Sequence, residues 1–236
     1  MLAIAPRAED NLIEIGPGRG ALTNELVATS ANLRVIEIDR DFTSQLAQQF
    51  AQTPLEIVQA DVLRYDFTLC GENMRLLGNL PYNISTPLLF HLLLFKDNIL
   101  DMHFMLQKEV VDRLSAESGP AYGRLSVMMQ YHFHIEHLFD VPPSAFSPPP
   151  AVTSAVARFI PRTWPQPVKV IGLLEKILAA AFSRRRKYLR NNLNGLLDKE
   201  QLDQLGIGAK TRAQELAVSD YMRLANALAD ANYMTK

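Results

Sequence analysis

Cysteine and long apolar runs are both scarce in this chain. Cys70 is the one cysteine among 236 residues, which excludes an intramolecular disulfide and a thiolate zinc site and is typical of a reducing cytosol. The longest apolar stretch, around Pro87 to Phe95, is too short to span a bilayer. The opening MLAIAPRAED has no charged segment followed by a long apolar core, so we expect no signal peptide, no membrane span and a cytoplasmic protein.

The chain also lacks a strong net charge, which is −1 at pH 7. This balance hides a local excess, because residues 158–190 contain nine basic residues and one acidic residue. Such a segment favours contact with phosphate groups, although a solvated helix face would give the same count. The run FSRRRKYLRNNL mixes aromatic and amide side chains with the cations, which favours RNA. We therefore predict RNA-binding residues at Arg184, Arg185, Arg186, Lys187 and Arg190.

Strand-like and helix-like segments alternate from residue 11 to about residue 110. This alternation predicts an α/β fold with a parallel sheet and helices on both faces. We expect strands at 11–16, 33–39, 55–61, 75–80 and 102–107, and helices at 20–28, 41–50 and 85–95. Ser85 is expected to cap the last of these helices.

The pattern changes in the second half of the chain. We expect longer β segments at 125–133 and 153–160, followed by helices at 169–182, 185–197, 199–206 and 218–230. The change places a boundary near residues 161–167. We therefore predict an α/β domain over residues 1–163 and a small all-α, basic domain over residues 164–236.

A glycine-rich loop, EIGPGRGA, follows the first expected strand. Glycine lets the backbone turn sharply and approach a ligand closely. Gly16, Gly18 and Ala21 satisfy the dinucleotide pattern G-x-G-x-x-G/A, so the loop indicates an adenosine-containing cofactor and leaves a nicotinamide dinucleotide open. A tight strand-to-helix turn without a ligand is the alternative.

Carboxylates lie at the ends of the second and third expected strands. Ligands of open α/β sheets bind at the carboxyl ends of the strands. Glu37 is therefore predicted to hold ribose hydroxyls, while Asp39 can cap the following helix. Asp61 can accept a hydrogen bond from an adenine amine or cap a turn.

The stretch GNLPY, which ends the fourth expected strand, separates the two cofactor classes. The N6 amine of adenine is a poor nucleophile because its lone pair is delocalised into the ring. Two acceptors, the Asn79 side-chain carbonyl and the Leu80 backbone carbonyl held by Pro81, can draw this amine toward tetrahedral geometry. Tyr82 offers a flat face for the base. A nicotinamide enzyme has no use for this set, whereas a methyltransferase does.

Together these motifs resemble those of the ribosomal RNA adenine dimethyltransferases. The resemblance rests on EIGPGRG, VIEID, QAD and NLPYNIS, and it continues at residues 104–109, 122–126, 142–146, 154–158 and 182–191. It spans nearly the whole chain. The basic C-terminal segment is most similar to the members that act on 16S rRNA rather than on 23S rRNA.

The resemblance implies a Rossmann-like class I methyltransferase that uses S-adenosylmethionine. The implied cofactor residues are Glu14, Gly16, Gly18, Glu37, Asp61, Val62 and Asn79. The implied catalytic residues are Asn79, Leu80, Pro81, Tyr82 and Phe146, with the two rings on either side of a flipped base. The implied reaction puts four methyl groups on two adjacent adenosines of a 16S rRNA hairpin in the immature small ribosomal subunit. We expect a monomer.

Relatives begin with a basic, aromatic leader that helps to close the cofactor site, whereas this chain opens on MLAIAPRAED. We therefore expect the chain to fold, to bind S-adenosylmethionine weakly, and to gain affinity when upstream residues are restored. A non-catalytic RNA-binding assembly factor on the same fold is the alternative function, against which the intact NLPY and glycine loop argue.

The histidines of YHFHIEH suggest a metal site at first sight. In a strand, His132 and His134 would share one face and His137 would point to the other. We therefore expect no metal there.

Overall fold

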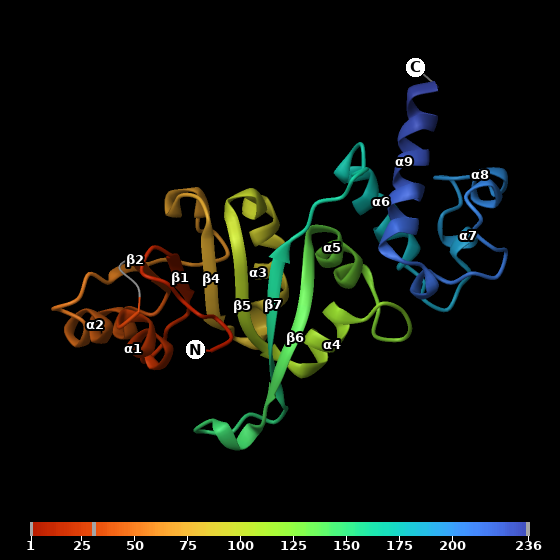
Figure 1. The fold of residues 1–236 in the computed structure, drawn as a ribbon. Helices are drawn as coiled ribbons and strands as arrows, with labels where there is room; N and C mark the ends of the chain where they lie inside the picture. The colour runs from red at the N-terminus through yellow and green to blue at the C-terminus, as the bar shows by residue number, and fades with distance from the viewer. Residues whose placement is uncertain (1, 30–31, 235–236) are drawn as a thin grey trace. The chain divides into compact units, whose positions relative to one another are not determined.

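The computed structural model describes residues 2–29 and 32–234 (Figure 1). The chain divides into two compact units. The first unit contains Met1–Val111 and Phe133–Pro161, and the second contains Asp112–His132 and Arg162–Lys236. The chain therefore leaves the first unit once, returns to it, and leaves it again at residue 161, within two residues of the predicted domain boundary.

The first unit is built on a mixed sheet of seven strands in the order β3-β2-β1-β4-β5-β7-β6. The strands β1 to β5 are parallel, and β7 runs antiparallel to both β5 and β6. Their bounds are β1 Asn11–Ile15, β2 Asn32–Glu37, β3 Glu56–Gln59, β4 Met74–Asn79, β5 Ile99–Gln107, β6 Phe133–Val141 and β7 Ser154–Pro161. The predicted parallel sheet is confirmed, and the carboxyl ends of its strands meet at one edge.

Helices α1 Ala21–Val27, α2 Arg40–Gln49 and α3 Tyr82–Leu92 connect parallel strands, and the 3-10 turn η1 Phe67–Cys70 lies between β3 and β4. The 3-10 turn η2 Leu93–Asn98 follows α3, helix α4 Lys108–Ser115 follows β5, and the 3-10 turn η3 Pro143–Ala145 lies between β6 and β7. Helix α2 begins because Asp39 accepts hydrogen bonds from the backbone N–H groups of Asp41 and Phe42. The capping role that the sequence left open for Asp39 is thus confirmed.

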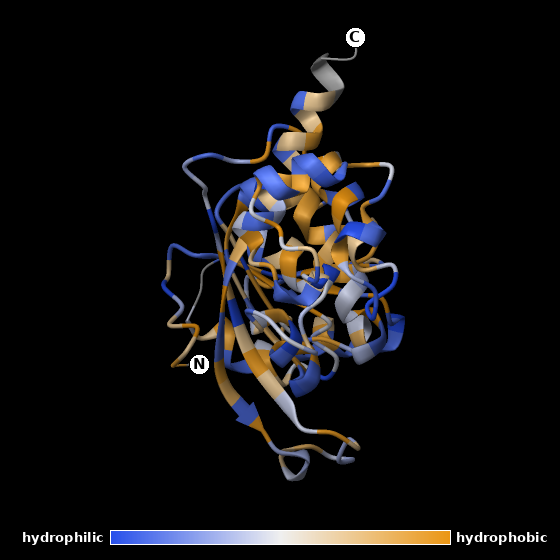
Figure 2. Ribbon diagram, turned by 90° about the vertical axis from the view of Figure 1, so that its right-hand side faces the viewer, coloured by the Kyte–Doolittle hydropathy of each residue, from blue (hydrophilic) through white to orange (hydrophobic). Residues whose placement is uncertain are grey.

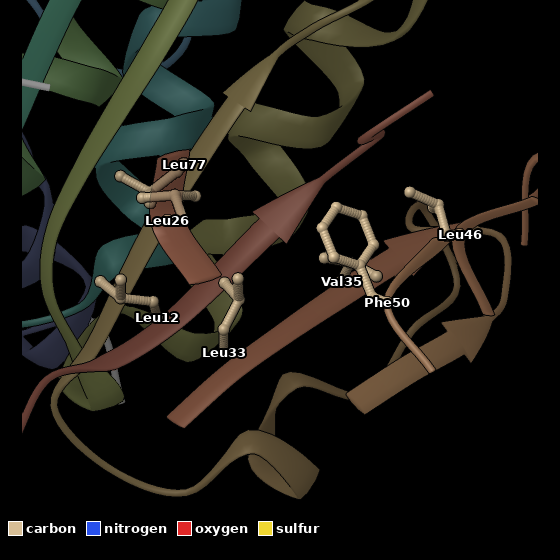
Figure 3. Close-up of a cluster of buried hydrophobic side chains, with 7 residues drawn as sticks. All are labelled: Leu12, Leu26, Leu33, Val35, Leu46, Phe50 and Leu77. Carbon is tan, nitrogen blue, oxygen red and sulfur yellow. The ribbon is translucent and has the colours of Figure 1, made fainter. Parts of the chain in front are cut away.

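One face of the sheet packs against α1 and α2 (Figure 3). Leu26 of α1 and Leu46 of α2 are buried against side chains that β1, β2 and β4 direct to the same face. The residues of this cluster are Leu12, Leu26, Leu33, Val35, Leu46, Phe50 and Leu77. The alternate residues of the same strands, such as Ile13 and Leu76, are also fully buried, so the opposite face is covered too.

The second unit is helical. It contains α5 Arg124–His132, α6 Ile171–Ala181, α7 Leu189–Asn192, α8 Lys199–Gln204, η4 Ala213–Glu215 and α9 Val218–Met234. Helix α9 buries Tyr221, Leu224 and Leu228 and packs against α6. One side of α9 is therefore hydrophobic and the other hydrophilic. In Figure 2 this appears as alternating orange and blue segments along the helix nearest the label C.

Three predictions about secondary structure are wrong. Residues 125–133 were expected to be β but form helix α5, because Leu125 to Met129 are buried all round and an apolar run without alternation does not reveal its period. Helix α3 begins at Tyr82, and Ser85 lies inside it and donates to the Tyr82 carbonyl instead of capping.

The third wrong prediction is the helix expected at 185–197. Only the short helix α7 forms there, since the Asn192 side chain donates to the carbonyls of Ala181 and Arg184 in a turn.

The part of the chain that the structure describes contains no helix with the length and apolar character of a membrane span. Within the same residues, no group of three or more His, Cys, Asp or Glu side chains is arranged to hold a metal ion. His134 and His137 lie beside Glu136 and Asp140 respectively, at 3.4 Å and 2.8 Å.

Candidate active site

The glycine loop joins β1 to α1 in a conformation that favours glycine. Gly16 and Gly18 have φ angles of 66° and 54°, in the left-handed region that other residues adopt at a cost. A Cβ atom added at either position would meet no atom within 4 Å. The backbone of the loop is therefore open on one side, as close approach by a ligand requires.

Glu37, at the end of β2, holds this loop in place. Its Oε2 atom accepts a hydrogen bond from the Gly18 N–H at 3.1 Å, and its Oε1 atom accepts from Ile38 and Asp39 at 2.9 and 3.0 Å. The side chain is buried. Each carboxylate oxygen has two lone pairs, so Oε2 keeps the capacity to accept from a second donor.

Glu14 lies on β1 directly beneath the loop and is 2% exposed. Its one described hydrogen bond is accepted from the Thr23 hydroxyl at 2.6 Å. Burial raises the pKa of Glu14 to about 7, and the nearby Glu37 carboxylate adds to this effect against the Thr23 hydrogen bond. A bound cation would favour the ionised form of this carboxyl.

The predicted acceptor pair lies at the end of β4, next to the loop. A Cβ added at Gly78 would come within 2.7 Å of the Ile15 carbonyl oxygen, so glycine is required for β4 to approach β1 here. Asn79 pairs with Met105 of β5, and the Leu80 N–H donates to the Met105 carbonyl at 3.1 Å. Within the described residues, the Asn79 side chain and the Leu80 carbonyl form no hydrogen bond, so both acceptors are available.

A cavity of about 560 Å³ connects these elements. All its lining residues belong to the first unit: Ala3, Ile4, Glu14, Gly16, Pro17, Gly18, Arg19, Ala21, Leu22, Gly78, Asn79, His103, Met105, Phe139, Phe146 and Val156. Five predicted site residues thus meet in one cavity, namely Glu14, Gly16, Gly18, Asn79 and Phe146. The remaining predicted residues lie outside its lining.

The structure places those other residues as follows. Leu80 is buried and Pro81 precedes α3, while the Tyr82 hydroxyl is 3.0 Å from the Ser154 hydroxyl of β7. Asp61 accepts from the Leu63 N–H at 3.0 Å in a local turn, and Val62 is buried. The turn-capping role that the sequence left open for Asp61 is therefore present.

Sequence reasoning missed what the last three strands contribute to the cavity lining, namely His103, Met105, Phe139 and Val156. They come from β5, β6 and β7, whose order in the sheet does not follow the sequence. A β-bulge between His137 and Phe139 shifts the register, so Phe139 pairs with Val156 and faces the cavity. Strand alternation alone could not reveal this, because a bulge changes the face of every residue after it.

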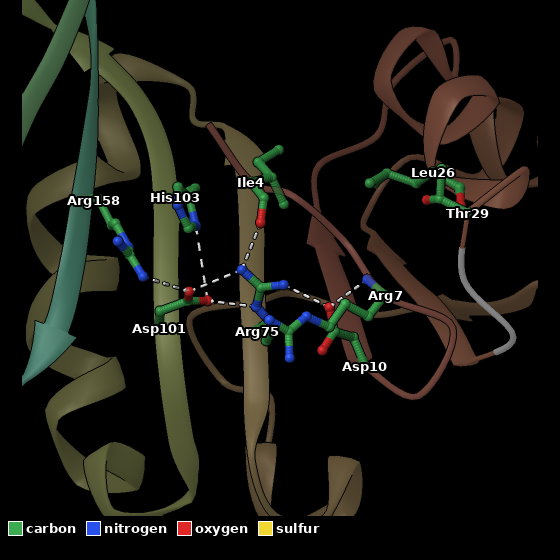
Figure 4. Close-up of polar contacts among 9 residues, drawn as sticks. All are labelled: Ile4, Arg7, Asp10, Leu26, Thr29, Arg75, Asp101, His103 and Arg158. Carbon is green, nitrogen blue, oxygen red and sulfur yellow. Dashed lines mark hydrogen bonds and ion pairs between the residues drawn. The ribbon is translucent and has the colours of Figure 1, made fainter. Parts of the chain in front are cut away.

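A buried network of ion pairs lies next to the cavity and includes Asp101, the neighbour of the lining residue His103 (Figure 4). Arg75 donates to both carboxylate oxygens of Asp101 at 3.0 Å, to Asp10 at 2.5 Å, and to the Ile4 carbonyl at 2.7 Å. Arg158 lies 3.6 Å from Asp101. Arg75 therefore fastens the N-terminal segment, which walls the cavity through Ala3 and Ile4, to β4 and β5.

The predicted RNA-binding residues, all in the second unit, differ in their surroundings. Arg184, Arg186 and Lys187 are exposed, and their side chains have no partner in the described part of the chain. Arg185 instead donates to the carbonyls of Pro120 and Tyr122, and Arg190 pairs with Asp203 at 3.4 Å.

The chain matches one protein family over almost its whole length. A family model described as ribosomal RNA adenine dimethylase matches residues 2–230. The chain belongs to this family. Proteins named ribosomal RNA small subunit methyltransferase A, from Dechloromonas aromatica (strain RCB) and Pseudomonas fluorescens, are each 48% identical to it. The first match covers 96% of this chain and 89% of the relative, and the second covers 97% and 87%.

Solved structures agree with the fold. A dimethyladenosine transferase from Plasmodium falciparum matches with a TM-score of 0.83 at 24% identity over 99% of this chain and 94% of its own. The 23S rRNA methyltransferase ErmE matches with a TM-score of 0.77 at 23% identity, over 97% and 94%. The expected Rossmann-like methyltransferase sheet and helical C-terminal region are confirmed. The family uses S-adenosylmethionine, and the open glycine loop and available Asn79 oxygen fit such a donor.

Proposed function

We propose that this chain transfers methyl groups from S-adenosylmethionine to the N6 amines of two adjacent adenosines in 16S rRNA, within the immature small subunit in the cytoplasm. The observation that carries the proposal is the meeting of the glycine loop, Asn79 and Phe146 in one cavity. Family membership and the names of the relatives support the reaction and the substrate.

The cofactor would be held by Gly16, Gly18, Glu14, Glu37 and Asn79, with Asp61 and Val62 toward its adenine. When bound, S-adenosylmethionine supplies an electrophilic methyl group on a positively charged sulfur. Glu37 would accept hydrogen bonds from the ribose hydroxyls and keep the hydrogen bond from the Gly18 N–H. This arrangement would put the donor across the carboxyl ends of the strands, where ligands of open α/β sheets bind.

The target amine would lie against the Asn79 side-chain oxygen and the Leu80 carbonyl, which the preceding β4 and the following Pro81 hold fixed. Acceptors that need no reorganisation stabilise positive charge as it grows on the amine nitrogen. Phe146 and Tyr82 would stack on the flipped base. The Tyr82 hydroxyl is held by Ser154, which would fix the position of its ring.

The exposed cations of the second unit, Arg184, Arg186 and Lys187, would contact phosphates of the same RNA, with Arg185 and Arg190 beside them. We propose that the chain acts as a monomer.

Methyl transfer to small subunits that lack the modification tests the proposal. The parent chain should produce N6,N6-dimethyladenosine in 16S rRNA, detected by mass spectrometry of nucleosides. Asn79→Ala should keep most of its affinity for S-adenosylmethionine, because the other proposed cofactor residues remain, and should lose about 10²–10³ in rate, as expected for one preorganised acceptor. A parent chain that binds immature subunits without methylating them would favour the assembly-factor alternative, and an Asn79→Ala variant with the parental rate would refute the mechanism.

A further inference from the structure

His103 is a buried imidazole that belongs to the lining of the cavity. Its residue is 3% exposed, and within the described part of the chain neither ring nitrogen has a hydrogen-bond partner. The Asp101 Oδ1 atom lies 3.8 Å from Nδ1, too far for a hydrogen bond. The backbone of Ala3 lies close enough to raise the pKa of the ring, but it does not meet the geometry of a hydrogen bond. Two buried polar atoms are therefore left without partners in a residue that faces open space.

The charged side chains around His103 supply no hydrogen bond to its ring. The Asp101 carboxylate already accepts from both arms of Arg75, and Arg158 lies 3.6 Å away. Burial lowers the pKa of His103, and the two arginines add to this effect against the attraction of Asp101. The ring is therefore neutral near pH 7 and offers one donor and one acceptor.

The position of His103 along β5 limits which part of a bound ligand can contact it. His103 precedes Met105 by two residues on the same face of β5, so it lies about 7 Å deeper in the sheet than the end of β4, where Asn79 pairs with Met105. A base that stacks on Phe146 enters at the strand ends. A group that reaches His103 must extend inward from Asn79.

We propose that His103 is a cofactor-binding residue that hydrogen-bonds the amino-acid end of S-adenosylmethionine. The inference rests on the proposed function, since it takes this donor and places its ribose at Glu37. From β2 to β5 the sheet spans three strand spacings, roughly 14 Å. A donor with adenosine over β2 and sulfur near Asn79 on β4 has its methionine moiety left to lie over β5.

The chemistry of the cavity matches that moiety. Its ammonium group donates and its carboxylate accepts, whereas a neutral imidazole accepts at one nitrogen and donates at the other. Glu14 adds a second acceptor in the same cavity. The unpartnered nitrogens of His103 would then be satisfied only when the complete donor is bound.

Two ligands that differ only in this moiety test the inference. S-adenosylhomocysteine has the amino-acid end, whereas 5′-methylthioadenosine lacks it. In calorimetry, His103→Leu should weaken binding of S-adenosylhomocysteine by about 5–30-fold and leave binding of methylthioadenosine within about twofold. His103→Asn, which keeps a donor and an acceptor, should lose less. His91→Leu is the matched control, because His91 bonds the Tyr65 carbonyl outside the cavity lining, and it should change neither affinity.

Equal losses for both ligands in His103→Leu, or none, would overturn the role of His103. Imidazole ¹⁵N shifts of the parent chain give the same answer without a substitution, should the variant fail to fold. His103 should shift with S-adenosylhomocysteine and not with methylthioadenosine, and an unchanged His103 signal in the S-adenosylhomocysteine complex refutes the contact. A parent chain that binds neither ligand would refute the cofactor assignment itself, and the role of His103 with it.

Discussion

Replacing Glu14 with glutamine should remove a pH dependence from the stability of the first unit. Glu14 has a pKa of about 7 in the folded chain, against 4.5 for an ordinary glutamate. Between these values the folded state holds a proton that the unfolded state releases. The stability that comes from this proton is fully present below about pH 4.5 and is lost as the pH rises through 7.

The magnitude follows from the two pKa values. Their difference corresponds to roughly 3 kcal/mol of unfolding free energy, lost between about pH 4.5 and pH 8. A glutamine at this position cannot ionise, and its amide oxygen can still accept from the Thr23 hydroxyl. Glu14→Gln should therefore gain stability relative to the parent as the pH rises, by a few kcal/mol at most.

Urea unfolding followed by circular dichroism, without cofactor and at several pH values, measures this difference. Subtracting the parent from the variant cancels the titration of all other groups. Glu25→Gln is a suitable control, because Glu25 lies exposed on α1, the helix that carries Thr23. The stability difference between Glu25→Gln and the parent should not vary with pH. If the difference in unfolding free energy between Glu14→Gln and the parent is equal at about pH 5 and about pH 8, the buried carboxyl is not protonated near neutrality.

Four other substitutions probe three separate parts of the chain. Arg75→Leu should lower the free energy of unfolding by about 3–5 kcal/mol in urea titrations, because Asp10 and Asp101 lose their shared cation; a loss below 1 kcal/mol would contradict this. Glu37→Ala should weaken the binding of S-adenosylmethionine in calorimetry. It should also lower the melting temperature, since three backbone N–H groups lose their acceptor. An unchanged melting temperature would show that Glu37 does not stabilise the loop. Arg186→Glu should lower the slope of RNA affinity against salt concentration by about one unit and leave the melting temperature unchanged. Arg185→Glu should also lower the melting temperature, because its side chain loses the hydrogen bonds to the Pro120 and Tyr122 carbonyls. An identical melting temperature for these two arginine variants would contradict the difference between them.

The sequence by itself determined the parallel half of the sheet and the motifs at its edge. Buried strands alternate there with helices, and a parallel sheet brings every strand end to one edge, so Gly16, Glu37 and Asn79 could be grouped without coordinates. The reaction class followed from residues 79–82, because the chemistry of an unreactive amine requires acceptors that few other sites need. These features are local in sequence, or depend only on a general rule of topology.

The tertiary structure alone decided what depends on register and on burial. Helix α5 was expected as a strand, because its apolar run takes its form from the contacts around it. His103 and Phe139 reach the cavity through the pairing of β5 with β4 and through a bulge in β6, neither of which the sequence pattern encodes locally. The elevated pKa of Glu14 and the unpartnered nitrogens of His103 arise from desolvation by residues distant in the chain, so only the folded protein creates them.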